Sequence, residues 1–378
     1  MKILFVIENL AGGGAEKVLT TLIKRIDKKK YDITVLSIVK TGVHVKEIEN
    51  ECKLKCILPD YNSIRNPIKK MAYKLKYKKV YREPIEEVYK KYIHEEYDIE
   101  IAFVEGFVTK LVAASNNKNS KKYAWVHTDM MNNPFADNYY NSLEDEIDCY
   151  NSYDRIFAVS KNVKEAFEEK FKIMNKVSIQ FNPVDSDEIL YKAKLSEPDL
   201  ICSYDGLKII SVGRLEEPKG YDRLLMAVSK FKEKNIKFKV FILGTGSQKE
   251  RFEEYIINNG IEEYVVLCGF QENPYPWIKN ADLFICSSRA EGFSTVATEA
   301  VILGKPVYTT DCSGMDELIS DSDCGKIFDN SQEGIEKMLE EVLLNQELIK
   351  EYSKAAQKRG LFFNIDNRIS EIEEILDN

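Results

Sequence analysis

Apolar residues recur along the chain in short runs that alternate with stretches of helical spacing. In the first half, runs that predict buried strands lie at 2–7, 32–39, 53–58, 98–104, 123–127, 155–160 and 176–181. After a weakly patterned stretch the alternation resumes, with predicted strands at 208–213, 238–243, 265–269, 283–287, 306–310 and 325–328. Strands that alternate with helices are typical of parallel sheets. We therefore expect the α/β fold class, with two Rossmann-like βαβ domains.

A chain of 378 residues is long enough for two domains of about 150–200 residues each. The run Asn182-Pro183-Val184-Asp185 looks like a hinge, which gives a predicted first domain, 1–184, and a predicted second domain, 185–364. The final stretch, 365–378, has apolar residues at helical spacing and predicts a last helix. Two facing sheets of this kind bind ligands at the carboxyl ends of their strands, so we expect an interdomain cleft.

The composition is that of a soluble globular protein, with 44% hydrophobic and 31% charged residues. The net charge of −8 argues against a general nucleic-acid binder. No apolar run approaches the roughly eighteen residues of a membrane span, and the first residues turn acidic too soon for a signal peptide. The eight cysteines are scattered without CxxC pairs, which indicates free thiols in a reducing compartment and no metal site. We expect a cytoplasmic protein.

Two carboxylates follow a predicted strand: Glu291 lies in the turn after it, and Glu299 lies about two turns further, inside the predicted helix. A helix N-terminus offers free N–H groups and the positive end of a dipole, which suit a diphosphate. If all the steps between them are helical, the carboxylates lie roughly 12 Å apart along the axis and can hold the two ends of one ligand. A sugar at Glu291 and a ribose at Glu299, with a diphosphate between them, predict a sugar nucleotide. The alternative is a pair of solvated carboxylates.

Two cations, Arg214 and Lys219, follow the first predicted strand of the second domain. Arginine offers a planar fork to phosphate oxygens and lysine a point charge, so together they can neutralise a leaving diphosphate without a metal ion. The alternative is a basic loop paired with Glu216 and Glu217. We expect no cofactor beyond the nucleotide-sugar donor itself.

Glycine-rich turns follow the predicted strands at 2–7 and 238–243. The first contains Gly13 and Gly14 and the second Gly244, but neither completes a dinucleotide fingerprint, because lysine stands where the last glycine is required. A nicotinamide or flavin enzyme is therefore disfavoured. The glycines let a ligand or the opposing domain approach the backbone next to a helix N-terminus. The alternative is a tight turn without a ligand.

In order and spacing these motifs, with Gly269-Phe270 and the Trp125-Val-His127 strand end, resemble glycosyltransferase family 4, the retaining, nucleotide-sugar-dependent enzymes of the GT-B fold. The resemblance covers nearly the whole chain and is strongest at 208–330. It implies that Glu291 and His127 contact the donor sugar, and that the last helix crosses back to the first domain. The other donor contacts it implies are the backbone of Gly292, Phe293, Ser294 and Thr295, the ribose ligand Glu299, the cations Arg214 and Lys219, and Gly269, Phe270 and Gln271 beside the base.

The resemblance implies transfer of a hexose or N-acetylhexosamine, with retained anomeric configuration and without metal, to a glycan or lipid-linked acceptor in cell-surface polysaccharide or glycoconjugate synthesis. UDP is the nucleotide that family frequency favours. Glu105, at another predicted strand end, is a further candidate for contact with donor or acceptor. Two alternatives stay open: an epimerase of the same fold that acts on a sugar nucleotide, and a partner subunit that binds the sugar nucleotide without catalysis.

The segment Arg65–Arg82 departs from the acidic whole, with eight basic residues and no acid. Four of its cations recur every fourth residue, which on a helix makes a stripe about 18 Å long; they are Lys70, Lys74, Lys78 and Arg82. Tyrosines and apolar residues flank the stripe. Such a helix suits an anionic membrane surface or a lipid-pyrophosphate acceptor, and we expect docking on the inner face of the cell membrane. RNA binding is the poorer interpretation, and a solvated surface helix is the other alternative.

Overall fold

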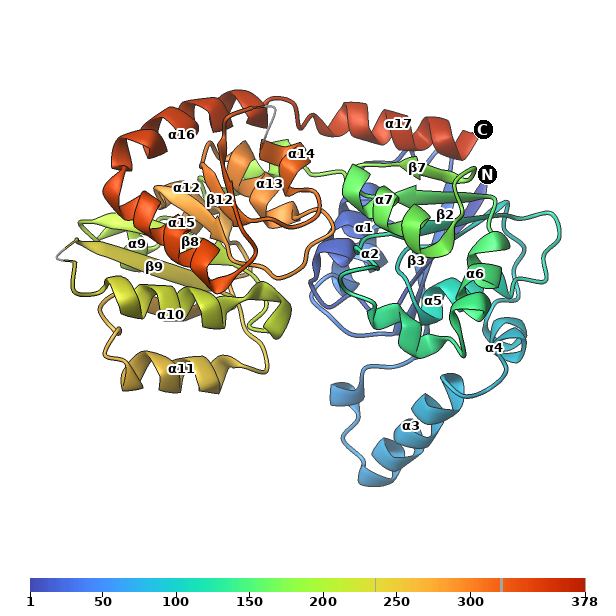
Figure 1. The fold of residues 1–378 in the computed structure, drawn as a ribbon. Helices are drawn as coiled ribbons and strands as arrows, with labels where there is room; N and C mark the ends of the chain where they lie inside the picture. The colour runs from blue at the N-terminus through green and yellow to red at the C-terminus, as the bar shows by residue number, and fades with distance from the viewer. Residues whose placement is uncertain (235, 320–321, 378) are drawn as a thin grey trace. The chain divides into compact units, whose positions relative to one another are not determined.

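The computed structural model describes residues 1–234, 236–319 and 322–377. The chain divides into two compact units, one of Met1–Pro183 with Asp366–Asn378 and one of Val184–Ile365. Each unit is a parallel sheet with helices on its two faces (Figure 1). The predicted parallel α/β architecture is therefore confirmed.

The first unit holds a seven-stranded sheet in the order β3-β2-β1-β4-β5-β6-β7, with every neighbouring pair parallel. Its strands are β1 (Lys2–Ile7), β2 (Asp32–Val39), β3 (Lys53–Leu58), β4 (Ile99–Ala102), β5 (Lys121–Val126), β6 (Arg155–Ala158) and β7 (Val177–Ile179). Its helices are α1 (Gly14–Arg25), α2 (Val45–Glu51), η1 (Tyr61–Ser63), α3 (Pro67–Val80), α4 (Ile85–Tyr92), α5 (Phe107–Ala113), η2 (Phe135–Tyr139), α6 (Leu143–Asn151), α7 (Lys161–Phe171) and the returning α17 (Ile365–Asp377).

The second unit holds a six-stranded sheet in the order β10-β9-β8-β11-β12-β13, again parallel throughout. Its strands are β8 (Leu207–Val212), β9 (Phe238–Leu243), β10 (Val265–Gly269), β11 (Leu283–Cys286), β12 (Val307–Thr310) and β13 (Gly325–Phe328). Its helices are α8 (Ser186–Lys192), α9 (Asp199–Cys202), η3 (Glu217–Lys219), α10 (Tyr221–Phe231), α11 (Lys249–Asn258), α12 (Tyr275–Asn280), α13 (Thr295–Ile302), α14 (Met315–Ile319), α15 (Gln332–Leu344) and α16 (Gln346–Gly360).

The central strands are apolar on both faces because helices cover both sides of each sheet. In β8, Ile209 and Ile210 are both fully buried, yet they belong to two separate hydrophobic clusters. Successive strand residues point to opposite faces, so one cluster fills each side of the sheet. This is why the strands could be recognised as unbroken apolar runs.

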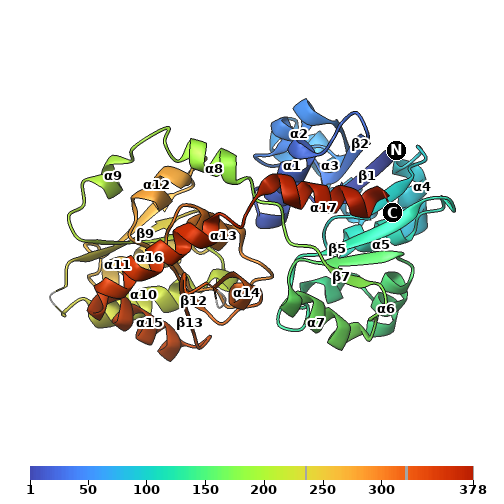
Figure 2. The ribbon, with the colours of Figure 1, turned by 90° about the horizontal axis from the view of Figure 1, so that it is seen from above.

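Helix α17 packs on the first unit, as the resemblance implied. Its apolar residues Ile369, Ile372 and Leu376 are buried, and the Tyr31 hydroxyl donates to Asp377 Oδ1 at 2.9 Å. Figure 2 shows α17 lying along the first unit beside α1. Residue 378, the last of the predicted helix, lies outside the described residues.

The structure adds detail to three local predictions. The weakly patterned stretch after residue 185 contains two short helices, α8 and α9. Strand β5 ends at Val126, so His127 begins the loop that follows it. Helix α13 starts at Thr295, so Glu291 lies in the preceding loop, as predicted; because the steps from Glu291 to Ser294 are not helical, the condition for a rise of roughly 12 Å is not met.

Helix α3 projects from the body of the first unit (Figure 1). Three of its apolar side chains, Ile68, Met71 and Leu75, are 74%, 63% and 64% exposed, and Val80 is the residue of the helix that is buried. Its tyrosines instead form a row in which Tyr77 and Tyr81 lie with ring centroids 4.7 Å apart. The exposed apolar residues recur at spacings of three and four, so they share one face of the helix.

Candidate functional site

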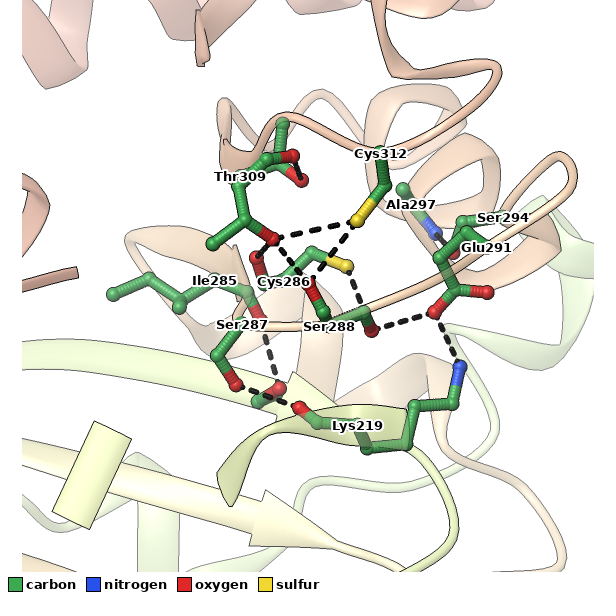
Figure 3. A network of polar contacts seen from close by, with 12 residues as sticks. Lys219, Ile285, Cys286, Ser287, Ser288, Glu291, Ser294, Ala297, Thr309 and Cys312 are labelled. Carbon is green, nitrogen blue, oxygen red and sulfur yellow. Dashed lines mark hydrogen bonds and ion pairs between the residues drawn. The ribbon is translucent and has the colours of Figure 1, made fainter. Parts of the chain in front are cut away.

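The carboxyl edge of the second sheet brings together two segments that are distant in sequence. Strand β8 leads to η3, which ends at Lys219, and strand β11 leads to the loop that contains Glu291. Because the carboxyl ends of parallel strands share one edge of a sheet, these side chains meet. Lys219 Nζ lies 2.6 Å from Glu291 Oε1 (Figure 3).

This ion pair is largely shielded from solvent, with 23% of the Lys219 side chain and 13% of the Glu291 side chain exposed. Burial lowers the pKa of Lys219, but the Glu291 carboxylate and other neighbouring groups together raise it by a larger amount. The net shift of the pKa is upward, so the amine is charged at neutral pH. The Ser288 hydroxyl also donates to Glu291 Oε1 at 2.6 Å. One carboxylate oxygen is therefore held by a cation and a hydroxyl.

Neighbouring side chains fix the two loops that carry the ion pair. The Ser287 hydroxyl donates to the Lys219 carbonyl at 2.9 Å, and the Thr310 hydroxyl donates to the Ser288 carbonyl at 2.6 Å. Arg289 forms a two-pronged pair with Asp222 at 2.8 and 2.7 Å. The ends of β8, β11 and β12 are thereby tied together around Glu291.

The second predicted cation is arranged differently. Arg214 is exposed, and its guanidinium makes no hydrogen bond with the described residues. The Glu216 carboxylate instead accepts from the backbone and hydroxyl of Ser247, both at 2.7 Å. These hydrogen bonds lower the pKa of Glu216, and the charge of Arg214 also lowers it, so Glu216 interacts electrostatically with this cation as well as by hydrogen bonds with Ser247.

The loop after Glu291 enters α13 through a capped N-terminus. Gly292 and Ser294 are buried, and the Ser294 hydroxyl accepts from the Ala297 N–H at 3.4 Å. Thr295 is the first helical residue, and the Glu299 side chain, 1% exposed, lies one turn further on. Phe293 sits between these buried residues and is itself partly exposed.

Two other predicted donor contacts lie in turns after β9 and β10. At Gly244 φ is 142°, and a Cβ there would stand 1.9 Å from the Gly213 carbonyl, so backbone packing alone requires glycine. At Gly269 φ is 69°, while a Cβ would meet nothing within 4 Å. Phe270 is 55% exposed, and the Gln271 amide donates to the Cys268 carbonyl at 2.8 Å. The turn after β10 is therefore the more open of the two.

The remaining predicted site residues belong to the first unit. Gly13 is the N-cap of α1 and Gly14 its first residue. His127 lies at the carboxyl edge of the first sheet, and its ring centroid is 5.1 Å from that of Phe103. Burial lowers the pKa of His127 to about 3, against a hydrogen bond with the Phe103 backbone that raises it. The imidazole is therefore neutral at physiological pH.

The His127 side chain and main chain have different surroundings. Its Nε2 atom is buried and has no hydrogen-bond partner among the described residues. Its backbone N–H donates to Glu105 Oε1 at 2.7 Å, and the Thr128 N–H donates to the same oxygen at 2.7 Å. Glu105 is 6% exposed, and burial raises its pKa to about 7.

Within residues 1–234, 236–319 and 322–377, no three His, Cys, Asp or Glu side chains are grouped as ligands of a metal ion. In the same part of the chain, no helix combines the length and the apolar character needed to cross a bilayer.

Comparisons with known proteins identify the family. A model described as Glycosyl transferases group 1 matches residues 203–359, and one described as Glycosyltransferase Family 4 matches residues 12–188. The chain is 30% identical over 369 residues to the N-acetylgalactosamine-N,N'-diacetylbacillosaminyl-diphospho-undecaprenol 4-alpha-N-acetylgalactosaminyltransferase of Campylobacter jejuni, covering 95% of this chain and 94% of the relative. The chain belongs to glycosyltransferase family 4.

Two further proteins are similar to this one over nearly its whole length. A second Campylobacter jejuni enzyme, named as a GalNAc-alpha-(1->4)-GalNAc-alpha-(1->3)-diNAcBac-PP-undecaprenol alpha-1,4-N-acetyl-D-galactosaminyltransferase, is 24% identical over 97% of this chain and 96% of its own. Anabaena HepE, crystallised with UDP-glucose, superposes with a TM-score of 0.76 at 19% identity over 100% of this chain and 99% of its own. The protein is therefore a glycosyltransferase with the GT-B fold.

The sequence pointed to Lys219 and Glu291 but not to the side chains that support them. Ser288 and Thr310 lie at strand ends of apolar segments, where a hydroxyl carries no pattern of its own. Arg223 is buried within α10 and donates to the Ser287 carbonyl at 2.9 Å, at a sequence separation of 64.

Proposed function

We propose that this glycosyltransferase moves an N-acetylhexosamine or hexose from a UDP-sugar to a lipid-linked glycan, with retention of the anomeric configuration and without a bound metal ion. The observation that carries the proposal is the Lys219–Glu291 ion pair beside the N-terminus of α13. It sets a fixed cation, a fixed carboxylate and a helix dipole next to one another, and these are the groups that a nucleotide-diphosphate sugar requires.

The donor would occupy the carboxyl edge of the second sheet. Its diphosphate would take Lys219 and Arg214 as counter-charges, its ribose Glu299 and its sugar Glu291. The exposed Phe270 and the open turn at Gly269 would flank the base. Lys219 is already partly desolvated and charged, so it needs no change of protonation to stabilise negative charge.

In the reaction, the bond between the anomeric carbon and the diphosphate oxygen breaks, and the acceptor hydroxyl oxygen bonds to the same face of that carbon. The acceptor proton passes to the leaving phosphate oxygen, so no protein base is required. Arg214 and Lys219 stabilise the charge that grows on the diphosphate. The neutral His127 would accept a hydrogen bond from a sugar hydroxyl at its unpartnered Nε2 atom.

Support for the acceptor comes from the relatives. Both Campylobacter jejuni enzymes are named for undecaprenol-linked diphosphate glycans and for transfer of N-acetylgalactosamine. The exposed face of α3 fits such an acceptor, because it offers apolar side chains next to cations. Ile68, Met71 and Leu75 would enter the headgroup boundary of an anionic membrane while Lys74 and Lys78 meet its phosphates.

The test is transfer by the purified chain in EDTA, with a panel of UDP- and GDP-linked sugars and an undecaprenyl-diphosphate glycan on vesicles. We expect one UDP-sugar to be consumed and the product to carry an α-linkage by NMR. Activity that requires an added divalent ion, or an inverted product, would contradict the proposal. Epimerised donor without transfer would instead favour the epimerase alternative.

A further inference from the structure

We infer that Glu105 is a positioning residue, which fixes the loop that carries His127 by accepting the backbone N–H groups of His127 and Thr128. In naming His127 as the substrate contact, this inference rests on the proposed function. Glu105 comes from the β4–α5 connection and His127 from the end of β5, so the contact joins two neighbouring strand ends.

The geometry of the contact is that of a capped loop. A single oxygen, Glu105 Oε1, accepts both N–H groups at 2.7 Å, which is short for hydrogen bonds from nitrogen. Two consecutive N–H groups held by one atom fix the direction of the chain at the point where β5 ends. The His127 imidazole, attached to this backbone, packs against the Phe103 ring, and this contact restricts its rotation.

The turn that delivers the carboxylate is itself constrained. Gly106, the next residue, has φ 84° and caps the N-terminus of α5. A Cβ at this position would stand 2.9 Å from the Tyr139 ring, so the close approach of η2 and the backbone conformation both require glycine. Glu105 is therefore presented to the His127 loop by a rigid element.

A carboxylate in the buried position of Glu105 costs free energy, because its charged form is removed from water. Glu105 is 6% exposed, and none of the described residues supplies a cation to it. The titratable groups that interact with it are Tyr150 of α6 and, through its backbone, His127, while Lys110 of α5 binds Asp145 and the Tyr139 carbonyl instead. Burial of an acid without a counter-charge raises its pKa, and a buried acid at a strand end is a candidate functional residue.

Strand β4 offers a matched control in Glu100. It is also fully buried with a raised pKa, but its carboxylate accepts from the Tyr89 and Ser115 hydroxyls at 2.9 Å and does not touch the His127 loop. Glu100→Gln and Glu105→Gln therefore remove the same charge from adjacent places. Only the second removes the anion that faces the His127 and Thr128 N–H groups.

The first measurement is independent of activity. In amide NMR spectra recorded from pH 5.5 to 8.5, we expect the His127 and Thr128 N–H resonances to titrate with a midpoint near 7. The titration should vanish in Glu105→Gln and persist in Glu100→Gln. Resonances that do not move with pH, or that move equally in Glu105→Gln, would overturn the inference even if the chain proves to transfer no sugar.

The second measurement uses transfer kinetics. Glu105→Gln should lower kcat by about tenfold or more through misplacement of His127, while the affinity for UDP stays unchanged. Glu105→Asp, with its shorter reach, should resemble Glu105→Gln, and Glu100→Gln should resemble the wild type. Equal kcat for Glu105→Gln and Glu100→Gln would make Glu105 a structural residue only. Circular dichroism of each variant confirms that it is folded.

Discussion

Lys219 and Glu291, 72 residues apart in the sequence, form an ion pair with 2.6 Å between Nζ and Oε1. The cation expected at the diphosphate and the carboxylate expected at the sugar thus neutralise one another. A donor that enters the site has to share or replace this contact. The pair therefore holds both side chains in place before the donor arrives, which reduces the ordering needed on binding.

Replacement of Lys219 should affect both binding and turnover. Lys219→Ala should weaken UDP binding about tenfold and lower kcat/KM about 100-fold, since the charge serves the ground state and the transition state alike. Calorimetry with UDP in EDTA and initial rates measure the two effects. The matched control is Lys230→Ala, which removes an exposed lysine that pairs with Glu336 in the same unit. Unchanged UDP affinity in Lys219→Ala would contradict the assignment.

Removal of the imidazole should separate binding from chemistry. His127→Ala should lower kcat about 10- to 100-fold, because a hydrogen bond to the reacting sugar is lost, and leave UDP affinity unchanged. The exposed His94 provides the control variant, His94→Ala. Normal turnover in His127→Ala would remove this residue from the site.

His127 should also stay neutral across the working range of pH. Its pKa is lowered to about 3 by burial, so its ring resonances should not titrate between pH 5 and 8. The native pKa lies below the value of 6.5 for the unfolded chain, so its contribution to stability is complete above pH 6.5 and is lost as the pH falls toward 3. Histidine ring NMR checks the first statement; a titration near 6.5 would show that the ring is solvated.

Glu105 should make stability depend on pH in the opposite sense. Its native pKa of about 7 lies above the unfolded value of 4.5, so its contribution is present below pH 4.5 and is lost as the pH rises through 7. The loss is on the order of 3 kcal/mol. Glu105→Gln should remove it, so that the variant gains stability over the wild type as the pH rises from 4.5 to 8. Urea unfolding of both proteins at pH 4.5 and pH 8 tests this prediction. A difference in the free energy of unfolding between variant and wild type that is the same at both pH values would contradict it.

Helix α3 should confer salt-sensitive binding to anionic vesicles. Each basic residue near such a surface contributes about 1 kcal/mol, so loss of four should abolish co-sedimentation while donor binding is spared. The test variant replaces Lys70, Lys74, Lys78 and Arg82 by glutamine. Its control replaces four exposed lysines of the second unit, Lys230, Lys234, Lys337 and Lys350. Equal sedimentation of both variants would leave α3 a solvated helix.

The apolar face of α3 gives a separate test of the same contact. Leu75→Ser and Met71→Ser should weaken vesicle binding without a change of charge, because they remove apolar area that the membrane would bury. Both side chains are exposed in the protein, so the substitutions should not lower the free energy of unfolding. Wild-type thermal stability is the expected control result. Retained binding in the double variant would mean that charge alone attracts the helix.

The strands could be predicted because helices cover both faces of each sheet and make the strands continuously apolar. All the predicted runs correspond to strands. Helix α8 was missed because it is only seven residues long, too short to show a period. The first residue of α13 was not predicted; the Ser294 cap decides that helical hydrogen bonds begin at Thr295.

Contacts between distant segments could be predicted only as far as strand order allows. The placement of Lys219 and Glu291 on one edge followed from two adjacent parallel strands, but their direct pairing depends on side-chain direction. The Glu105 contact with the His127 backbone was not foreseen, because a carboxylate that binds main-chain N–H groups leaves no trace in residue types. A hydrogen bond of this kind is visible only in three dimensions.

The return of α17 to the first unit has a consequence for synthesis of the chain. All of Val184–Ile365 is made before the helix that buries Ile369, Ile372 and Leu376 against residues translated first. The second unit can fold on the ribosome as an unbroken segment. The first unit exposes the apolar surface that α17 covers until α17 has been synthesised. Translation order thus makes the N-terminal half the last to be completed, and a stop codon before residue 366 would leave that surface open to aggregation.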